Sequence, residues 1–442
     1  MKRVFFLGIL ALFMVFFNVS HASQDITIDD AVRMVVKESQ DIKRAEMNVK
    51  RMEAIKSHAN ASRWFQADAR ANYSKFINMD NMQWWGDGLI PQVLPVPDPN
   101  NPVNLLMMPE HTAAVGININ QPLFTFGQIG YAVEAARRGV NQAEISKELA
   151  MAEIRLAAIQ LYWSAKITDE FLRIAENSLR NTRSAQNQLT ATGRANRSNL
   201  VKISADVAAR EIDVQDARFN RDSAFRMLKV YLGLEEEDEI RLTSDLPATF
   251  SSIEPKEIKP YEVRVLEEQI KMFEAERWRH NMGYAPTISA TAGYDYTTFG
   301  WRAEQLGGLY QHNARAGVVL SMPLFDGGSR RAQATGSVMQ ASMARQELEL
   351  TRRKKNAEYR DLIQRYGYLR NTFSEFNRAK DLANRAYQLS RDRFLTGQTT
   401  AIELADVERG AAGAEMALLN AKLQMLTTAE GIKRLEAGSE NL

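Results

Sequence analysis

The sequence predicts an α+β chain in which one unit, made of a helix, a β-hairpin and a long helical hairpin, occurs twice. Two tracts without proline, residues 123–246 and 324–442, are rich in strong helix formers and are free to form very long helices. Segments in which apolar and polar residues alternate precede each tract, as strands do. The two halves match at a nearly constant offset, which indicates an internal duplication.

The first 22 residues have the form of a secretory signal peptide. Lys2 and Arg3 precede the apolar run 4–17, and Ser20 and Ala22 supply small residues before a cleavage point. The run is short for the alternative, a retained anchor, which needs about 20 apolar residues. With the duplication, this predicts three parts: a signal peptide at 1–22, a first repeat at 23–254 and a second repeat at 255–442.

Composition and motifs argue against an enzyme or a nucleic-acid partner. The 56 basic and 54 acidic residues are nearly balanced, and there are no cysteines to form disulfides or thiolate metal sites. Phosphate-binding loops, nucleophile elbows and metalloprotease helices are all missing from the sequence. We therefore expect no catalytic residue, no cofactor and no metal. The acidic run 235–239 is expected to be a solvated loop.

Each proline-free tract is expected to form a helical hairpin. Gly193 and Gly397 lie in the polar breaks TGRANRSN and TGQTTAIE, where glycine is typical of a helix C-cap before a turn. The outgoing arm of about 65 residues would be roughly 100 Å long. The offset between the repeats rises from 201 at Pro122 and Pro323 to 204 at the two glycines, so the second long helix should be three residues longer. A heptad stripe, typical of coiled-coil packing, is formed by Tyr359, Leu362, Tyr366, Leu369, Phe373 and Phe376.

Residues 65–73, 112–119, 287–296 and 314–320 are predicted to form four strands in two hairpins, each with one apolar and one polar face. Their length and terminal aromatics are typical of membrane-spanning strands. Four strands cannot close a barrel in a bilayer, so a membrane location requires oligomerisation, and three copies would supply 12 strands around a lumen. The alternative is a periplasmic coiled-coil scaffold or adaptor with a water-exposed β domain, because the same alternation is expected there.

Several segments resemble the TolC family of outer-membrane efflux proteins. They are the N-terminal TIDDAVRMVVKESQDIKRAEMNVKRMEA, the paired QPLFTFGQ and MPLFDGGS, the two glycine turns and the duplicated element order. The resemblance covers nearly all of the mature sequence. It implies a homotrimer with a 12-stranded outer-membrane β-barrel, continued by a coiled-coil α-helical tunnel in the periplasm. It also implies a passive duct for tripartite efflux or type I secretion in a Gram-negative bacterium, with a periplasmic adaptor, an inner-membrane pump and outer-membrane lipid as partners.

The same resemblance assigns candidate site residues. It places Glu403 and Asp406 at the constriction of the tunnel tip, where a ring of like charges in a trimer would favour cations. Asn199 stands where an acid commonly follows the first glycine, so that turn would give a neutral ring. The alternative is that both acids are merely solvated. Candidates for adaptor contact, or for turn geometry alone, are Gly193, Leu200, Phe394 and Gly397.

The strand-to-helix joints are the last predicted site. Proline ends strand pairing because it lacks an N–H, and glycine lets the backbone turn into the helix. We also expect Leu324 and Phe325 to pack at the second joint. The candidate barrel-to-tunnel junctions are Pro122 and Gly127 in the first repeat and Pro323, Gly327 and Gly328 in the second.

Overall fold

The computed structural model describes residues 24–76, 82–84, 103–105, 110–191, 197–300 and 302–438. The predicted signal peptide and Gly193 lie outside these ranges. The chain forms two compact units. The first contains the chain up to Val49 with Gln142–Glu267 and Gln346–Leu442, and the second contains Lys50–Asn141 and Glu268–Arg345. Each unit thus takes segments from both halves of the sequence.

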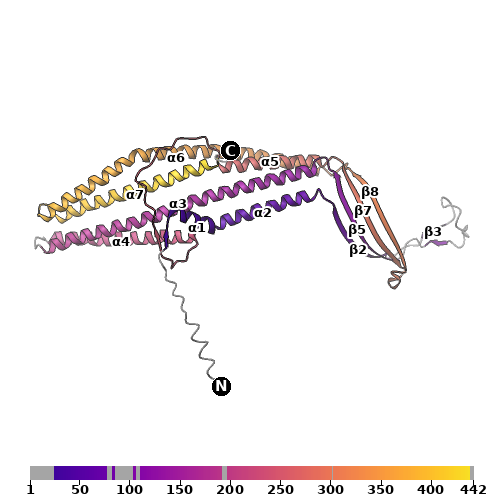
Figure 1. Ribbon diagram of the computed structural model, residues 1–442, viewed down its shortest axis with the longest axis horizontal. Coiled ribbons are helices and arrows are strands. Elements are labelled where there is room, and N and C mark those ends of the chain that lie inside the picture. The colour runs from indigo at the N-terminus through magenta and orange to yellow at the C-terminus, as the bar shows by residue number, and fades with distance from the viewer. Residues whose placement is uncertain are drawn as a thin grey trace, which may run out of the picture. The chain divides into compact units, whose positions relative to one another are not determined.

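The elements alternate between helices and strands in the predicted order (Figure 1). The α-helices are α1 (Ile28–Glu38), α2 (Gln40–Ala61), α3 (Gln128–Ala191), α4 (Arg197–Leu232), α5 (Tyr261–Met282), α6 (Ser329–Leu395) and α7 (Ala401–Ala437), with a short 3₁₀ helix, η1 (Ala303–Gln305). The strands are β1 (Gln24–Ile26), β2 (Gln66–Lys75), β3 (Met82–Trp84), β4 (Val103–Leu105), β5 (His111–Phe124), β6 (Ile240–Leu242), β7 (Thr287–Gly300) and β8 (Leu309–Ser321).

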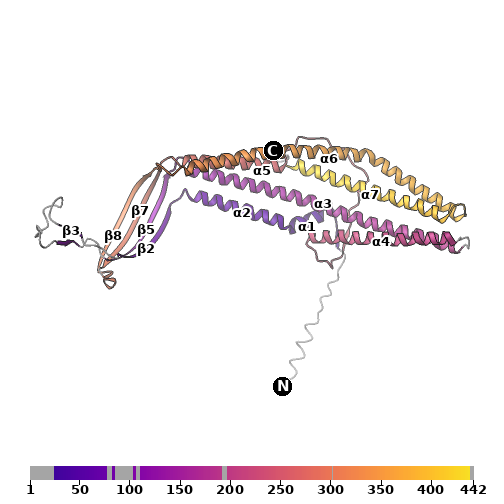
Figure 2. The ribbon, with the colours of Figure 1, turned by 180° about the vertical axis from the view of Figure 1, so that it is seen from behind.

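The predicted long helices are confirmed. Helix α3 has 64 residues and α6 has 67, so the second is three residues longer, as the sequence offsets require. In the first unit α3 runs beside α4, and α6 runs beside α7, in both views (Figures 1 and 2). These pairs are the two expected helical hairpins. Among the described residues, no helix combines the length and the apolar character that crossing a membrane requires.

Aromatic residues of the long helices anchor the core of the first unit. Tyr162 of α3 is fully buried, and its hydroxyl donates to the carbonyl of Ile26 and accepts the N–H of Ser244, both at 3.0 Å. Ile26 is the last residue of β1 and Ser244 follows β6, and these two strands form a short parallel pairing that the sequence did not indicate. On α6 the heptad stripe is confirmed, since Tyr359, Tyr366 and Leu369 are buried in one cluster.

The second unit contains one antiparallel sheet with the order β2-β5-β7-β8. Both predicted hairpins are present, and pairing of β5 with β7 joins them. The strands extend beyond the predicted limits, most clearly β7, which continues to Gly300. β2 and β8 are the two edges, and no other described strand pairs with their outer sides.

One face of this sheet is apolar and exposed to solvent in the single chain. Val115 and Ile117 of β5 are 58% and 53% exposed, and Val318 and Leu320 of β8 are 69% and 68% exposed. Isolated soluble proteins rarely expose apolar patches this continuous, so such a face normally meets lipid or another protein.

Candidate functional site

The turn between α6 and α7 has the geometry that glycine was predicted to supply. Gly397 has φ +76°, a left-handed conformation that costs a non-glycine residue roughly 1–2 kcal/mol. Its N–H donates to the carbonyl of Phe394 at 3.0 Å, and the N–H of Gln398 donates to that of Arg393 at 2.8 Å. These two bonds form a Schellman motif, which satisfies the last carbonyls of α6.

Glu403, the first predicted constriction residue, is exposed and closes the N-terminus of α7. The hydroxyl of Thr400 accepts the N–H of Glu403 at 3.2 Å, and the carboxylate of Glu403 accepts the N–H of Thr400 at 3.1 Å. This is a capping box. A hydrogen bond from the Thr399 hydroxyl, followed by the bond from Thr400, lowers the pKa of Glu403. The pattern T-x-x-E in the sequence was sufficient to predict the cap.

Asp406, the second predicted residue, is also exposed and lies one turn further along α7. Its carboxylate pairs with Arg409 at 2.9 Å, and Arg409 pairs with Asp206 of α4 at 2.8 Å. The arginine thus ties the two helical hairpins together near their turns. Sequence reasoning missed it, since its partner Asp206 lies 203 residues away.

Two of the predicted adaptor-contact residues, Leu200 and Phe394, pack in one small apolar cluster. Its buried members are Leu189, Ile203, Ala401 and Ala405. Leu200 belongs to α4 and Phe394 to α6, so residues beside both turns share a core. Both side chains are partly buried, and they hold the turns in place whatever else they contact.

The first strand-to-helix joint differs from the prediction. Pro122 lies inside β5, opposite Ser289, and the register shifts between Pro122 and Phe124. The proline therefore sits at a bulge, which tolerates its missing N–H, while the strand continues to Phe124. Phe126 and Gly127 then take positive φ values of 49° and 89° before α3 begins.

The second joint follows the prediction in its backbone but not in its packing. β8 ends before Pro323, and Gly327 and Gly328 have φ of 66° and 86°. Asp326 accepts the N–H groups of Gly328 and Arg330 at 3.0 and 3.1 Å, so it caps α6. The expected packing of Leu324 and Phe325 within the chain is wrong: they are 89% and 90% exposed, because no described residue covers this short extended segment.

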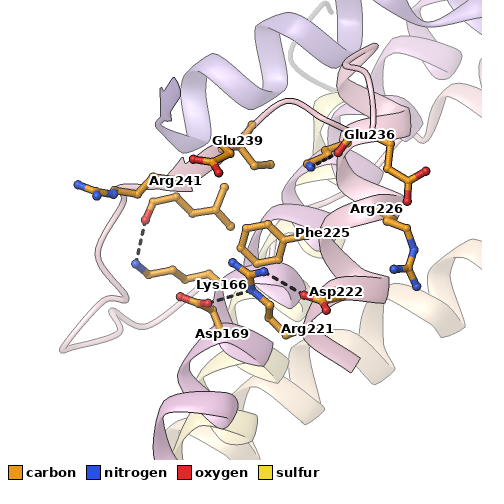
Figure 3. Close-up of a pocket in the computed structure, with 12 residues that line it drawn as sticks. Lys166, Asp169, Arg221, Asp222, Phe225, Arg226, Glu236, Glu239 and Arg241 are labelled. Atoms are coloured by element: carbon orange, nitrogen blue, oxygen red, sulfur yellow. Dashed lines mark hydrogen bonds and ion pairs between the residues drawn. The ribbon is translucent and has the colours of Figure 1, made fainter. Parts of the chain in front are cut away.

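A cavity of about 740 Å³ lies in the first unit between α3, α4 and the segment around β6 (Figure 3). Arg221 pairs there with Asp169 and Asp222 at 3.2 and 2.9 Å. Burial acts to lower the pKa of Arg221, but these hydrogen bonds outweigh it and raise the pKa. Lys166 donates to the carbonyl of Leu242 at 2.9 Å. Arg221 thus joins α4 to α3, and Lys166 holds β6 against α3.

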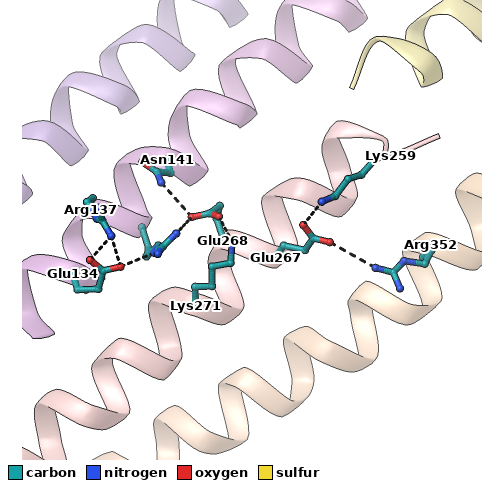
Figure 4. Close-up of polar contacts among 9 residues, drawn as sticks. Glu134, Arg137, Asn141, Lys259, Glu267, Glu268, Lys271 and Arg352 are labelled. Carbon is teal, nitrogen blue, oxygen red and sulfur yellow. Dashed lines mark hydrogen bonds and ion pairs between the residues drawn. The ribbon is translucent and has the colours of Figure 1, made fainter. Parts of the chain in front are cut away.

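Polar contacts also hold the helices within each unit (Figure 4). In the second unit Glu268 of α5 binds Arg138 of α3 at 3.2 Å and Lys271 at 2.7 Å. Burial acts to raise the pKa of Glu268, yet these cations lower it. In the first unit Glu267 pairs with Lys259 at 3.0 Å and Arg352 at 3.6 Å. In the ranges that the structure covers, no group of three or more His, Cys, Asp or Glu side chains is arranged to hold a metal ion.

Solved structures similar to this chain are outer-membrane proteins. CusC has a TM-score of 0.73 at 16% identity, covering 92% of this chain and 90% of that chain. VceC of Vibrio cholerae has a TM-score of 0.72 at 14% identity, and the match covers 93% of this chain and 96% of VceC. The MtrE outer membrane channel of Neisseria gonorrhoeae, solved in an open state, has a TM-score of 0.72 at 15% identity. That match covers 93% of this chain and 89% of MtrE. The chain thus has the fold of outer-membrane channel proteins, a helical part combined with a β domain.

The sequence comparison agrees with the fold. Residues 267–438 match the family described as outer membrane efflux protein, and no curated protein matches the chain by sequence. This match covers less than half of the chain, and over residues 267–438 it confirms the resemblance to the TolC family of outer-membrane efflux proteins. Proteins of this family are passive conduits and not enzymes. The family match therefore confirms the expectation that the chain is not an enzyme.

Proposed function

We propose that the chain is one subunit of a homotrimeric export duct in the outer membrane of a Gram-negative bacterium. Three four-stranded sheets close a 12-stranded barrel in the lipid, and the long helical hairpins continue it as a tunnel in the periplasm. The duct is passive and works with a periplasmic adaptor and an inner-membrane pump, in tripartite efflux or type I secretion. The efflux family match supports this assignment.

The observation that carries the proposal is the incomplete sheet. Its edge strands β2 and β8 have no strand partner on their outer sides among the described residues, and one face of the sheet is apolar and exposed. Unpaired backbone groups in lipid cost several kcal/mol each, so a lipid location requires other copies to pair with both edges. A trimer with threefold symmetry satisfies this, since β2 of each copy meets β8 of the next.

For the tip we propose that Glu403 and Asp406 form the constriction, with Gly193, Leu200, Phe394 and Gly397 at the turns that meet the adaptor. The exposure of both carboxylates supports the charge role, while the capping box of Glu403 supports a structural one. The internal duplication, with repeats at 23–254 and 255–442 after a cleaved signal peptide, accounts for two such turns per chain.

The test is to fractionate cells and record purified protein in planar bilayers. We expect an oligomer that resists dissociation in detergent, partitions with the outer membrane and conducts ions. Recovery as a water-soluble periplasmic monomer would instead favour the alternative, a coiled-coil scaffold or adaptor without a membrane barrel.

The same recordings separate the two roles of the tip acids. Replacing Glu403 and Asp406 together by alanine should raise leak conductance or lower cation selectivity. Glu403→Gln is the matched control, because glutamine keeps the capping box and removes only the charge. If Glu403→Gln behaves as wild type while Glu403→Ala does not, the carboxylate acts through the helix cap and the charge assignment is wrong.

A further inference from the structure

The polar face of the sheet carries its charges in one narrow band. Apart from Lys75 at the end of β2, the four strands contain four residues with full charges. These are Asp68, Arg70, Asp295 and Arg315. They occupy two neighbouring cross-strand rows. One row is Asp68, Asn118, Gly293 and Arg315, and the other is Arg70, Gly116, Asp295 and Asn313.

The charges in this band are paired with one another. Arg70 binds Asp68 at 2.8 Å on β2. Arg315 of β8 binds Asp295 of β7, and it also reaches across β7 to the side-chain carbonyl of Asn118 on β5. The second contact connects the first hairpin with the second. The band therefore contains two positive and two negative groups per chain, with no net charge.

Glycines make room for this arrangement. A Cβ at Gly293 would lie 2.9 Å from Oδ1 of Asn118 and 3.0 Å from Nη2 of Arg315, so the bridge between them passes over a position that must lack a side chain. A Cβ at Gly116 would collide with the carboxylate of Asp295. Gly317, further along β8, has no atom near its own missing Cβ and is not needed for the contact.

We propose that this band is a charge-neutral filter inside the barrel, one that admits small cations and anions alike. The inference rests on the proposed function, because only a closed barrel turns the polar face into the wall of a lumen. Polar residues face the interior of such barrels, so threefold symmetry would place six acids and six arginines at one level. Each Arg315 cancels the field of its neighbouring Asp295, and the barrel then discriminates little between small cations and anions.

Ion pairs with only a structural role would give the same contacts, so the test must measure the permeability of the channel to cations and anions. Arg315→Gln leaves three uncompensated Asp295 carboxylates and should shift the permeability ratio towards cations, by roughly threefold for screened charges at the lumen wall. Asp295→Asn should shift it towards anions by a similar factor. The double variant should return to the wild-type ratio. Reversal potentials in a salt gradient measure each of these values.

Two matched glycine variants test the geometry without removing a charge. Gly116→Ala displaces Asp295 from Arg315 and should change the ion selectivity, whereas Gly317→Ala should leave it unchanged. A wild-type channel that conducts, with Arg315→Gln, Asp295→Asn and Gly116→Ala all keeping its selectivity, would overturn the filter alone. A wild-type protein that forms no channel would overturn the proposed function, and the filter with it.

The cysteine-free sequence allows a second measurement that does not depend on conductance. Asn313→Cys lies in the band on the polar face, and Ala314→Cys is its neighbour on the apolar face. In membranes, a charged, water-soluble thiol reagent should modify Asn313→Cys and spare Ala314→Cys. The opposite labelling pattern would place the band outside the water-filled lumen and refute the filter.

Discussion

Replacing Tyr162 by phenylalanine should loosen the N-terminal segment of the chain without disturbing the long helices. The tyrosine is fully buried, and its hydroxyl joins Ile26, at the end of β1, to Ser244, just after β6. Phenylalanine keeps the ring and its packing against Trp163, whose centroid lies 5.3 Å away. The change therefore removes two hydrogen bonds and almost nothing else.

The magnitude follows from what each former partner retains. The carbonyl of Ile26 still accepts the N–H of Thr243 at 3.1 Å, so it loses one of two bonds. The half-buried N–H of Ser244 loses the Tyr162 oxygen. One weakened acceptor and one unsatisfied donor together cost about 2 kcal/mol. If the free energy of local opening of this segment decreases by that amount, the amides of the segment should exchange about 30-fold faster.

Native-state hydrogen exchange read by mass spectrometry measures this effect peptide by peptide. The acceleration should be confined to residues 24–28 and 239–246. Tyr366→Phe is the matched control, because Tyr366 donates a single bond, at 2.8 Å, to the carbonyl of the exposed residue Ser251. Tyr366→Phe should accelerate exchange only in residues near 251, and by a smaller factor than Tyr162→Phe does at its own segments. Exchange within about twofold of wild type at 24–28 and 239–246 in Tyr162→Phe would refute the reasoning, since a loss near 1 kcal/mol already gives fivefold.

Two further predictions concern a turn and a buried acid. Gly397→Ala should destabilise the α6–α7 turn by roughly 1 kcal/mol and increase its proteolysis, while the control Gly410→Ala, in open space inside α7, should strengthen its helix. Because the pKa of Glu268 is lowered in the folded chain, its stabilising contribution is fully present above the ordinary glutamate pKa of 4.5 and is lost as pH falls through the folded pKa. The protection of amides in α3 and α5 around Arg138 and Glu268, measured relative to the intrinsic exchange rate at each pH, should therefore fall at acidic pH. Glu268→Gln should abolish that dependence, and an unchanged pH profile of protection in Glu268→Gln would contradict the prediction.

Much of the fold could be predicted because its signals are local. The helices follow from long proline-free tracts, and the strands from alternation with period two. The heptad stripe on α6 is enough to predict the packing of Tyr359, Tyr366 and Leu369, which are buried in one cluster. The parallel pairing of β1 with β6 could not be predicted, because each strand has only three residues and its partner lies more than 200 positions away.

The candidate site was predicted less completely. The glycine at the α6–α7 turn could be predicted because a positive φ favours glycine. The pattern T-x-x-E also indicates the capping box of Glu403, although the family resemblance assigns Glu403 only to the constriction. The tie from Arg409 to Asp206 depends on how two hairpins pack, and no local pattern encodes that contact. Pro122 was assigned to a strand end because proline usually stops pairing, whereas a bulge allows β5 to continue past it.

The pair Tyr162 and Tyr366 shows how a duplicated sequence can keep a position while its contacts diverge. The two residues match at the offset of 204 that relates the long helices, and both are buried on the helix that leaves the sheet. Both hydroxyls donate to a backbone carbonyl of a segment outside the long helices, at Ile26 and at Ser251. Only Tyr162 also accepts an N–H, because β1 and β6 exist in the first half and have no described counterpart beside Tyr366. The added strand pair thus explains why the first tyrosine should be the more sensitive of the two.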